Sequence, residues 1–491
     1  MALAPFFDRI YGAVGSHLAV SRESLAASLD STVVGINCES PLTSNDRFIA
    51  EMTVNLVARL YPTLAFSGSS DLISSLRSLA LEINPNIQFS PEAPLGTTVS
   101  IGPSNAASSL FPSASGWVAR LTHSDPAASG PENPYSSAAA AAIACAELFR
   151  RIFLHTEPEA DLSLSLLDFS SGTGEQLELA SDQIGRVLFV GVGAIGNAAI
   201  WTLARDCKIS GNLILTDHET LSLSNLQRYV LGRYSDVSKS KVSLAAEHLA
   251  GSKLSYITFS SSIEDLSPPE GWTQPPTTCI SVDNVAGRRV AQALLPETVI
   301  NGWTGDASLG ASWHQLGRDA ACLACLYQPH GQGLSAIQQA ARALGLLEER
   351  AAVLWITRGS LSKEELRHAA KQLGVKPSVL SGWKTKPLPD LYTDVVCGAV
   401  PIDLQAVGRV EVVPLAHQSV LAGALMAAEL IKRSQSSLTR ISQPESLVTW
   451  DDILKPPPKI WVRPRPREAG CICTDAVYQE VYLEKWGHRV E

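Results

Sequence analysis

Three glycines at the end of a short apolar run are the first residues whose spacing suggests chemistry. The run Val187–Val190 ends at Gly191; Gly193 and Gly196 follow, and an apolar, alanine-rich stretch begins at Asn197. Glycine allows a tight turn and lets backbone amides approach a phosphate, while the N-terminus of a following helix favours negative charge. The spacing therefore predicts a nucleotide-binding loop between a buried parallel strand and a helix.

Polar residues after this loop indicate which kind of nucleotide it binds. A second apolar run, Leu213–Leu215, leads to Asp217, where an acid would meet a ribose hydroxyl. Asn225, Arg228 and Lys241 come next. A nicotinamide enzyme does not need them, whereas a nucleoside triphosphate site does, because several phosphate charges must be offset and the α-phosphate held for attack.

The order of these elements resembles that of the ThiF/MoeB/HesA and ubiquitin-activating-enzyme superfamily. The residues that carry the resemblance are Gly191-x-Gly193-x-x-Gly196, Asp217-x-Glu219, Ser224-Asn225-Leu226-Gln227-Arg228, Lys241, and Ser281–Asn284 followed by Arg288. Five ordered elements are a far more specific signal than a lone glycine triplet. The alternative is an ordinary dinucleotide-binding fold with incidental polar residues.

The resemblance implies an α/β fold in which a Rossmann-like adenylation domain with a mostly parallel sheet binds ATP. The residues expected to contact ATP are Gly191, Gly193, Gly196, Asp217, Asn225, Arg228 and Lys241. Asp217 would hold the ribose, Asn225 would orient a phosphate oxygen, and Arg228 and Lys241 would offset phosphate charge.

Asp283 is the residue expected to bind Mg²⁺. A helix is predicted over Val285–Leu295, so Asp283 lies at the carboxyl end of a strand, where open α/β sheets place ligands. Asp283 resembles the magnesium-binding Asp of the superfamily's Asp-Asn step. An N-cap of the following helix is the other role open to it.

Four cysteines form two short-spaced pairs, Cys322-x-x-Cys325 and Cys471-x-Cys473. Thiolates so spaced can both reach one tetrahedral zinc ion, and two pairs complete a closed structural site. The resemblance implies such a Zn²⁺ site, although the superfamily's second pair is usually CxxC. A redox CxxC and simple free thiols are the alternatives.

Cys397 stands apart from these pairs, in a turn beside Gly398. An exposed turn is a place where an acyl group could reach a thiolate. Its position resembles that of a thioester or persulfide cysteine in related enzymes, although the Pro-x-Cys-Thr pattern of eukaryotic activating enzymes is missing; an inert loop cysteine is the alternative. The remaining cysteines are interpreted as small buried hydrophobic residues: Cys38, Cys145, Cys207 and Cys279.

Length and composition limit the class of protein. With 491 residues the chain is too long for a single core. The net charge of −9, without a Lys/Arg block, argues against a nucleic-acid partner, and no apolar run approaches a membrane span. Nine cysteines without a secretory signal indicate a reducing compartment, so a cytoplasmic protein is expected.

The layout of the chain predicts four regions. They are a degenerate adenylation-like α/β domain over residues 1–175, the active ATP-binding domain over 181–330, a helical insertion near the catalytic cysteine over 331–396, and the end of the adenylation domain with a cysteine-containing tail over 397–491. The first region shows a strand–helix order and an alanine-rich helix from Ser136 to Phe153, but VVGINCESPLTSN replaces a glycine loop. An unrelated α/β accessory domain is the alternative.

Together these features predict an activating enzyme that adenylates the C-terminal carboxylate of a ubiquitin-like protein with Mg-ATP. Cys397 would capture the acyl group as a thioester and pass it to a conjugating enzyme. The chain most resembles activating enzymes of bacterial ubiquitin-like conjugation systems, some of which belong to antiphage defence. A homodimer or an internal pseudo-dimer is expected. A ThiF/MoeB-like sulfur-carrier adenylyltransferase and a catalytically inactive scaffold are the alternatives.

Overall fold

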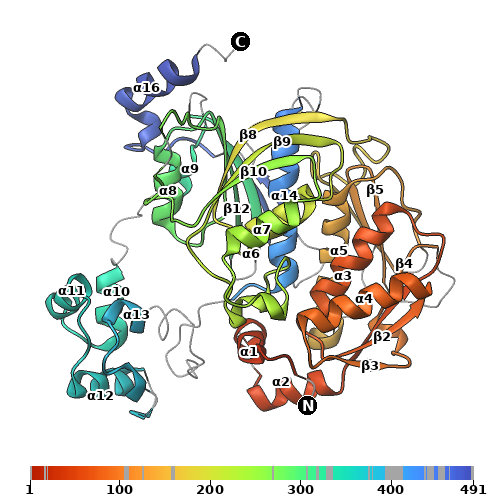
Figure 1. Ribbon diagram of the computed structural model, residues 1–491, viewed down its shortest axis with the longest axis horizontal. Helices are drawn as coiled ribbons and strands as arrows, with labels where there is room; N and C mark the ends of the chain where they lie inside the picture. Colours follow the sequence, from red (N-terminus) through yellow and green to blue (C-terminus); the bar gives the residue numbers. More distant parts are fainter. Residues whose placement is uncertain are drawn as a thin grey trace. The chain divides into compact units, whose positions relative to one another are not determined.

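The chain folds into two compact units (Figure 1). The first comprises Met1–Phe7, Ser21–Gln328 and Pro414–Glu491, and the second Asp8–Val20 and Pro329–Val413. The residues that this computed structural model describes are 3–15, 18, 20–103, 110–123, 126–155, 161–267, 270–305, 308–316, 320–327, 336–373, 376–378, 380–392, 413–435, 438, 447–451, 459–463 and 465–487. No helix in these ranges is both long and apolar enough to cross a membrane.

The N-terminal half of the first unit is built on a wholly parallel sheet with the strand order β3-β2-β1-β4. Its strands and helices are β1 (Val33–Cys38), β2 (Thr63–Gly68), β3 (Gln88–Ser90), β4 (Thr98–Ile101), α2 (Arg22–Asp30), α3 (Ser44–Val57), α4 (Ser70–Ile83) and the 3-10 turn η1 (Leu95–Thr97). Five of the six residues of β1 are buried, as expected of a parallel strand covered on both faces.

A small antiparallel sheet and one long helix complete this half. The sheet, in the order β5-β6-β7, consists of β5 (Phe111–Ser115), β6 (Val118–Thr122) and β7 (Leu162–Ser165). Helix α5 (Pro134–Phe149) is buried along its whole length, and a π-helical turn, η2 (Arg150–Leu154), continues it. Its N-cap is Asn133, whose side chain accepts hydrogen bonds from the amides of Tyr135 and Ser136.

The C-terminal half of the first unit has an eight-stranded sheet in the order β10-β9-β8-β11-β12-β13-β14-β15, of which the first five strands are parallel. Its strands are β8 (Asp182–Val190), β9 (Ile209–Thr216), β10 (Leu254–Phe259), β11 (Thr277–Ile280), β12 (Thr298–Thr304), β13 (Ser308–His314), β14 (Leu447–Asp451) and β15 (Lys459–Arg463). Its α-helices are α6 (Ala194–Leu203), α7 (Lys241–Leu249), α8 (Val285–Ala293), α9 (Leu323–Leu326), α14 (Ala416–Ser434) and α16 (Ala476–Trp486). The 3-10 turns are η3 (Leu223–Gln227), η4 (Tyr234–Asp236) and η8 (Ile472–Thr474).

In the order β10-β9-β8-β11 the direction of winding reverses at β8 and β11. Doubly wound sheets bind their ligands at such a switch point. The predicted α/β class with a Rossmann-like domain in the C-terminal part is therefore confirmed. The many prolines between Trp450 and Pro466 favour an extended chain over a helix. The described part of this stretch forms the end of β14 and then β15.

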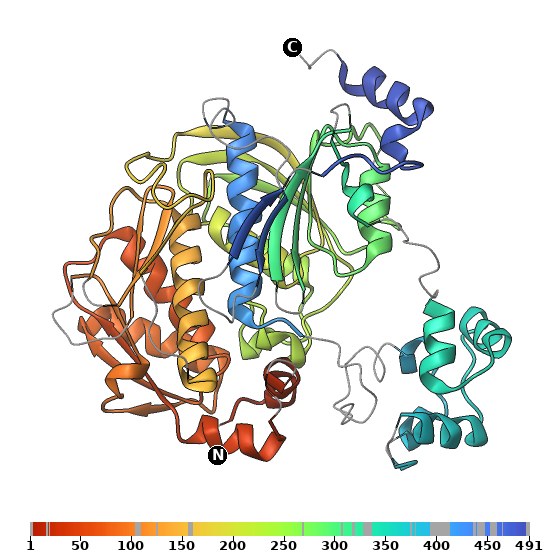
Figure 2. The same cartoon turned by 180° about the vertical axis from the view of Figure 1, so that it is seen from behind.

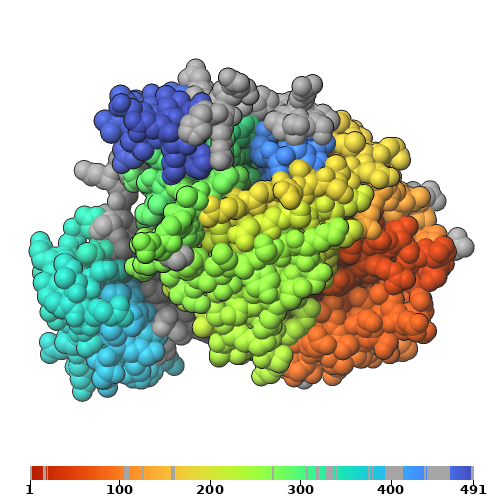
Figure 3. Space-filling view, turned by 45° about the horizontal axis from the view of Figure 1, so that its top comes forward, coloured from red at the N-terminus to blue at the C-terminus, as the bar shows by residue number. Residues whose placement is uncertain are grey.

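Helices α5 and α14 pack against each other where the two halves meet, and α14 also packs against α6 (Figure 2). Each carries a buried glutamate near its end, Glu147 or Glu429, followed by basic residues three and four positions later. In the space-filling view the surfaces of the two halves join without a break (Figure 3).

The second unit is helical and has its own core. Its elements are α10 (Ala336–Leu344), α11 (Glu348–Ile356), α12 (Lys363–Gln372), the 3-10 turn η5 (Ser381–Trp383) and α13 (Leu388–Leu391), with most of α1 (Phe7–Gly15). Leu344, Ala369 and Leu388 are fully buried in this core. The N-cap of α12 is Ser362, which forms a capping box with Glu365. The amphipathic pattern over Ser378–Trp383 predicts a further helix, but the described residues of that range form only the short η5.

Candidate nucleotide and metal sites

The three predicted glycines form the loop between β8 and α6, and each lacks a side chain for a different reason. Gly191 has a φ of +88°, and a Cβ there would lie 2.9 Å from Val282 Cγ1. A Cβ on Gly196 would lie 2.4 Å from the carbonyl oxygen of Gly191. A Cβ on Gly193, the N-cap of α6, would meet nothing within 4 Å. Packing thus requires two of the glycines, while Gly193 leaves open space at the helix N-terminus, where a phosphate would approach.

Asp217 follows β9 directly and lies against this loop. One carboxylate oxygen accepts a 2.7 Å hydrogen bond from the amide of Val192, and the other accepts a 2.9 Å bond from the amide of Glu219. Ser281, after β11, donates to the carbonyl of Gly191 at 2.8 Å. Side chains from the ends of β9 and β11 therefore hold the loop from two sides, at the edge where the sheet binds ligands.

Asn225 and Arg228 lie in and directly after η3. Ser222 and Asn225 form a capping box, in which the Asn225 side-chain oxygen accepts from the amide of Ser222. This leaves the amide group of Asn225 to serve a ligand. Arg228 is the C-cap of η3, and its charge acts on the nearby carboxylate of Glu219.

Lys241 begins α7 and is buried, with its ammonium group paired to Glu219. Burial alone would raise the pKa of the Glu219 carboxyl, but the charge and the hydrogen bond of Lys241 lower it overall. Glu219 is half-exposed, whereas Lys241 is not. This ion pair was not predicted from the sequence, although Glu219 belongs to the Asp217-x-Glu219 element. A bound phosphate would compete with Glu219 for the lysine.

Asp283 lies after β11 with an exposed side chain. The N-cap of α8 is not Asp283 but Asn284, whose side-chain oxygen accepts a 2.6 Å bond from the amide of Gly287. The N-cap alternative for Asp283 was therefore wrong, and one oxygen of its exposed carboxylate accepts a 3.5 Å hydrogen bond from the side-chain amide of Asn284. Arg288 instead points into the core, where it donates to the side chain of Asn301 and to the carbonyl of Gly302.

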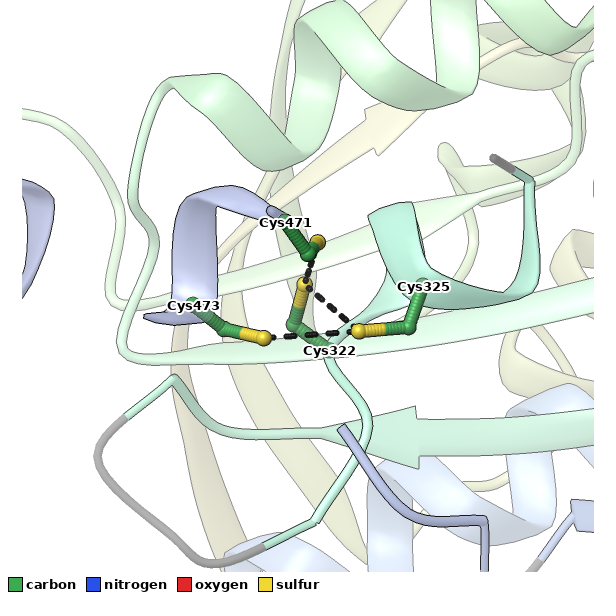
Figure 4. Close-up of side chains that lie close together, drawn as sticks. All are labelled: Cys322, Cys325, Cys471 and Cys473. Atoms are coloured by element: carbon green, nitrogen blue, oxygen red, sulfur yellow. Dashed lines mark hydrogen bonds between the residues drawn. The ribbon is translucent and has the colours of Figure 1, made fainter. Parts of the chain in front are cut away.

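The two cysteine pairs meet in one cluster (Figure 4). Cys322 and Cys325 flank the start of α9, Cys471 and Cys473 lie at η8, and the four sulfur atoms lie within 4.8 Å of one another. Sulfur–sulfur distances are 3.9 Å within the first pair and 3.6 and 3.3 Å between the pairs. A tetrahedral zinc ion with Zn–S bonds of about 2.3 Å would set these distances at about 3.8 Å. The residues fit a structural zinc site.

The surroundings of the cluster agree with a structural role. All four cysteines are buried, and hydrogen bonds from Cys322 and Cys325 lower the pKa of the Cys473 thiol to about 4. The tail beyond the cluster is held to the same half of the unit, because Tyr482 donates to the carbonyl of Glu297 and Trp486 to that of Leu295, both at 2.9 Å. The cluster thus ties the chain end to the C-terminal sheet.

The other cysteines differ in their surroundings. Cys38, Cys145 and Cys279 are buried, and burial raises the pKa of each thiol, that of Cys38 to about 12. Cys207 is exposed, so its prediction as a buried residue was wrong; it lies in the turn between α6 and β9, outside both. Cys397 lies outside the described residues.

Comparison with known proteins gives two family matches. The profile of the ThiF family matches residues 163–449, and that of Prokaryotic E2 family C matches residues 41–154. The chain is 31% identical to the uncharacterized protein y4jF of Sinorhizobium fredii (strain NBRC 101917 / NGR234), over 100% of this chain and 98% of that protein.

Solved structures show a more distant likeness. The crystal structure of E. coli MccB with ATP is 17% identical, with a TM-score of 0.36, over 60% of this chain and 68% of that one. PaaA is 14% identical, with a TM-score of 0.31, over 58% of this chain and 65% of that one. The chain spans about two thirds of the length of these structures.

Proposed function

Because the chain belongs to the ThiF family, we propose that it is an activating enzyme that uses Mg-ATP to adenylate the C-terminal carboxylate of a ubiquitin-like protein. The observation that carries the proposal is the edge of the parallel sheet between β8 and β11. There the glycine loop with the open N-terminus of α6 lies beside Asp217, and Asp283 presents a carboxylate that caps no helix. This set supplies what an adenylation site needs: phosphate donors, a ribose acceptor and a cation ligand.

The proposed reaction joins a carboxylate to the nucleotide. A carboxylate oxygen of the protein substrate attacks the α-phosphorus, the bond from that phosphorus to its bridging oxygen breaks, and pyrophosphate leaves. Arg228 and Lys241 offset the charge on the phosphates, and Lys241 exchanges Glu219 for a phosphate oxygen. When held by Asp283, Mg²⁺ supplies further stabilisation of the charge that develops on the phosphates.

The N-terminal half is proposed to be a degenerate adenylation-like domain that serves as the internal partner of the active one. Its sheet has the same relative strand order, and α5 matches α14 in the position of its buried glutamate and basic residues. At the corresponding helix N-terminus, however, Thr43 and Asp46 form a capping box, and Asp46 also accepts a 2.6 Å bond from Ser129. A carboxylate of the chain itself therefore occupies the position at which a phosphate would bind.

The match of residues 41–154 to Prokaryotic E2 family C raises a second role for this half, that of a conjugating enzyme. Such an enzyme needs a reachable thiolate. Cys145 is the only cysteine in that range; it is 5% exposed, and burial raises the pKa of its thiol. We therefore propose that the match reflects membership of a ubiquitin-like conjugation system and that the conjugating enzyme is a separate partner.

Cys397 is proposed to receive the acyl group from the adenylate. The thiolate attacks the acyl carbon, AMP leaves, and the thioester passes to the conjugating enzyme. In the first unit the chain resumes after the insertion at Pro414, whose carbonyl oxygen lies 3.5 Å from the side-chain amide of Gln227. Since Gln227 precedes Arg228, Pro414 lies close to the proposed phosphate site, 17 positions after Cys397 in the sequence.

The proposed function is tested by ATP–pyrophosphate exchange and intact-mass analysis with a panel of β-grasp proteins that end in a free carboxylate. At least one should drive exchange and form a reductant-sensitive adduct, whereas Cys397→Ala should keep exchange and lose the adduct. Cys207→Ala, which removes an exposed thiol, is the matched control and should keep both. If the panel contains the cognate carrier and none of its proteins stimulates ATP–pyrophosphate exchange, the proposed adenylation is contradicted. An adduct that survives in Cys397→Ala would contradict the thioester role, and a thiocarboxylate product would indicate a sulfur-carrier enzyme instead.

A further inference from the structure

The segment that carries the proposed phosphate ligands, residues 223–233 (the phosphate segment), is held by side chains of the N-terminal half. Within its own half it is also held at Leu231, whose amide donates to Asn197 and whose carbonyl lies 2.9 Å from a ring nitrogen of His248. Two longer hydrogen bonds run from the side chains of Gln227 and Tyr229 to the carbonyls of Pro414 and Lys241, at 3.5 and 3.4 Å. The carbonyls of Leu226, Val230 and Gly232 instead accept hydrogen bonds from the end of α3.

Arg59, just after α3, makes most of these contacts. Its guanidinium donates to the carbonyl of Leu226 and, at 3.0 Å, to the carbonyl of Gly232. It also donates twice to the side-chain oxygen of Asn55, at 3.1 and 2.9 Å. These bonds join the two ends of a turn of the phosphate segment to one rigid, planar group.

Asn55 orients this group and adds a third contact. Its side-chain oxygen accepts from Arg59, while its amide donates to the carbonyl of Val230 at 2.9 Å. Asn55 is 0% and Arg59 1% exposed. One side chain thus fixes the guanidinium and the backbone that the guanidinium does not reach.

Burial of the charged Arg59 guanidinium costs free energy that a neutral side chain in the same contact would not cost. Among the described residues no carboxylate pairs with it, and its acceptors are all neutral. A buried cation with neutral partners only is unfavourable and is retained where its position serves another purpose. Two bonds to backbone on either side of Arg228 are what a positioning role requires.

We propose that Arg59 and Asn55 are positioning residues that set the geometry of the phosphate segment, so that the N-terminal half determines the affinity of the C-terminal half for the triphosphate. The inference rests on the proposed function, because it assumes that Asn225 and Arg228 contact phosphate. The ligand class affected is a nucleoside triphosphate, and the effect acts through its phosphates, because the bonds from Arg59 and Asn55 are to this segment and none is to the glycine loop or Asp217.

The test is equilibrium binding of Mg-ATP and of AMP to the full chain. Arg59→Met should weaken ATP binding at least tenfold and AMP binding by less than threefold, because AMP carries only one of the three phosphates. Arg59→Lys keeps the charge but not the forked pair of donors, so its ATP affinity should lie between those of Arg59→Met and the wild type. Asn55→Asp keeps an acceptor for Arg59, loses the donor to Val230, and should also weaken ATP binding selectively.

The matched control is Glu51→Gln. Glu51 forms an ion pair with Arg205 across the same contact between the halves. Among the described residues its side chain makes no hydrogen bond to the phosphate segment, on which it acts only through its charge near Arg233. It should change ATP affinity by less than twofold. Unchanged ATP affinity in folded Arg59→Met and Asn55→Asp, or an equal loss for ATP and AMP, would overturn the inference. Wild-type protein that binds no ATP would overturn the proposed function and this inference with it.

Discussion

The N-terminal sheet, β3-β2-β1-β4, and the parallel strands β10-β9-β8-β11 of the C-terminal sheet share a strand order, yet the loops after their first strands differ. After β8 come three glycines and an α6 N-terminus capped by no side chain. After β1 comes a longer loop, and Thr43 and Asp46 cap α3 with a carboxylate. The same helix N-terminus is thus filled by the chain in one half and left for a ligand in the other.

The comparison extends to the next strand of each sheet and to the helices between the halves. β11 is followed by Asp283, whereas β4 is followed by Gly102 and Pro103, which carry no charge. Helices α5 and α14, in contrast, keep the same buried arrangement of a glutamate and two basic residues. The frame that joins the halves, helices α5 and α14, therefore carries the same ion-pair arrangement in each half. The residues proposed to do chemistry belong to the C-terminal half alone.

The largest expected effects concern this shared frame. Glu147 pairs with Arg150 and Arg151, and Glu429 with Lys432 and Arg433, all buried or nearly so. Because these substitutions remove the buried negative charge that faces two buried cations, Glu147→Gln and Glu429→Gln should each lower the free energy of unfolding by about 3–5 kcal/mol. Denaturant titration measures this.

The surface pair of Glu82 and Arg233 provides the control, since Glu82→Gln should cost about 1 kcal/mol or less. A large loss in one helix and none in the other would show that α5 and α14 are not equivalent parts of the frame.

The next effect separates the halves by chemistry. If Asp283 holds Mg²⁺, Asp283→Asn should slow ATP–pyrophosphate exchange by about a hundredfold or more, because metal stabilisation of a transferring phosphoryl group amounts to several kcal/mol. Asn284→Ser keeps an oxygen to cap α8 and should retain most of the exchange. Near wild-type exchange in folded Asp283→Asn would contradict the assignment of Asp283 as the Mg²⁺ ligand.

A smaller effect concerns the metal cluster, which the described residues place in the C-terminal half alone. Purified protein should contain about one zinc per chain, and Cys471→Ser should lower the melting temperature by a few degrees while most adenylation remains, because the cluster fixes the tail and not the nucleotide loop. Cys207→Ser, at an exposed thiol, should leave the melting temperature unchanged. Elemental analysis that finds no zinc in unchelated protein would end this interpretation.

Local patterns in the sequence predicted the glycine loop between β8 and α6 and the meeting of the two cysteine pairs. The backbone of the loop requires glycine at Gly191 and Gly196, so the spacing of these two residues is a strong local signal. Two close pairs of thiols can meet in one site even when they are 149 positions apart, as Cys322 and Cys471 do. The run His417–Arg433, rich in alanine and glycine, predicts a helix, and Thr98–Ile101 predicts a strand; α14 and β4 have these bounds to within one residue.

The features that the sequence did not reveal depend on the fold. Whether Asp283 or Asn284 caps α8 is decided by side-chain geometry, since both types make good N-caps. Cys207 lies beside an apolar helix but outside it, so hydrophobic pattern could not predict its exposure. The contact of Arg59 with Leu226 joins residues 167 positions apart, and no local pattern indicates it. Helices α11 and α16 were not predicted, and α16 has no clear apolar face that would reveal it.

The most direct test of the central claim, that one of two like-folded halves binds ATP, is the number of Mg-ATP molecules bound per chain at equilibrium. We expect one ATP molecule per chain. Gly193→Ala should weaken that binding at least tenfold without loss of stability, because its Cβ would enter space that the protein leaves open. Asp46→Asn, at the matching helix of the other half, should leave ATP affinity unchanged. Binding of two ATP molecules per chain would contradict the claim that the C-terminal half alone binds ATP. Binding of one ATP that is unaffected by Gly193→Ala and weakened by Asp46→Asn would contradict it as well.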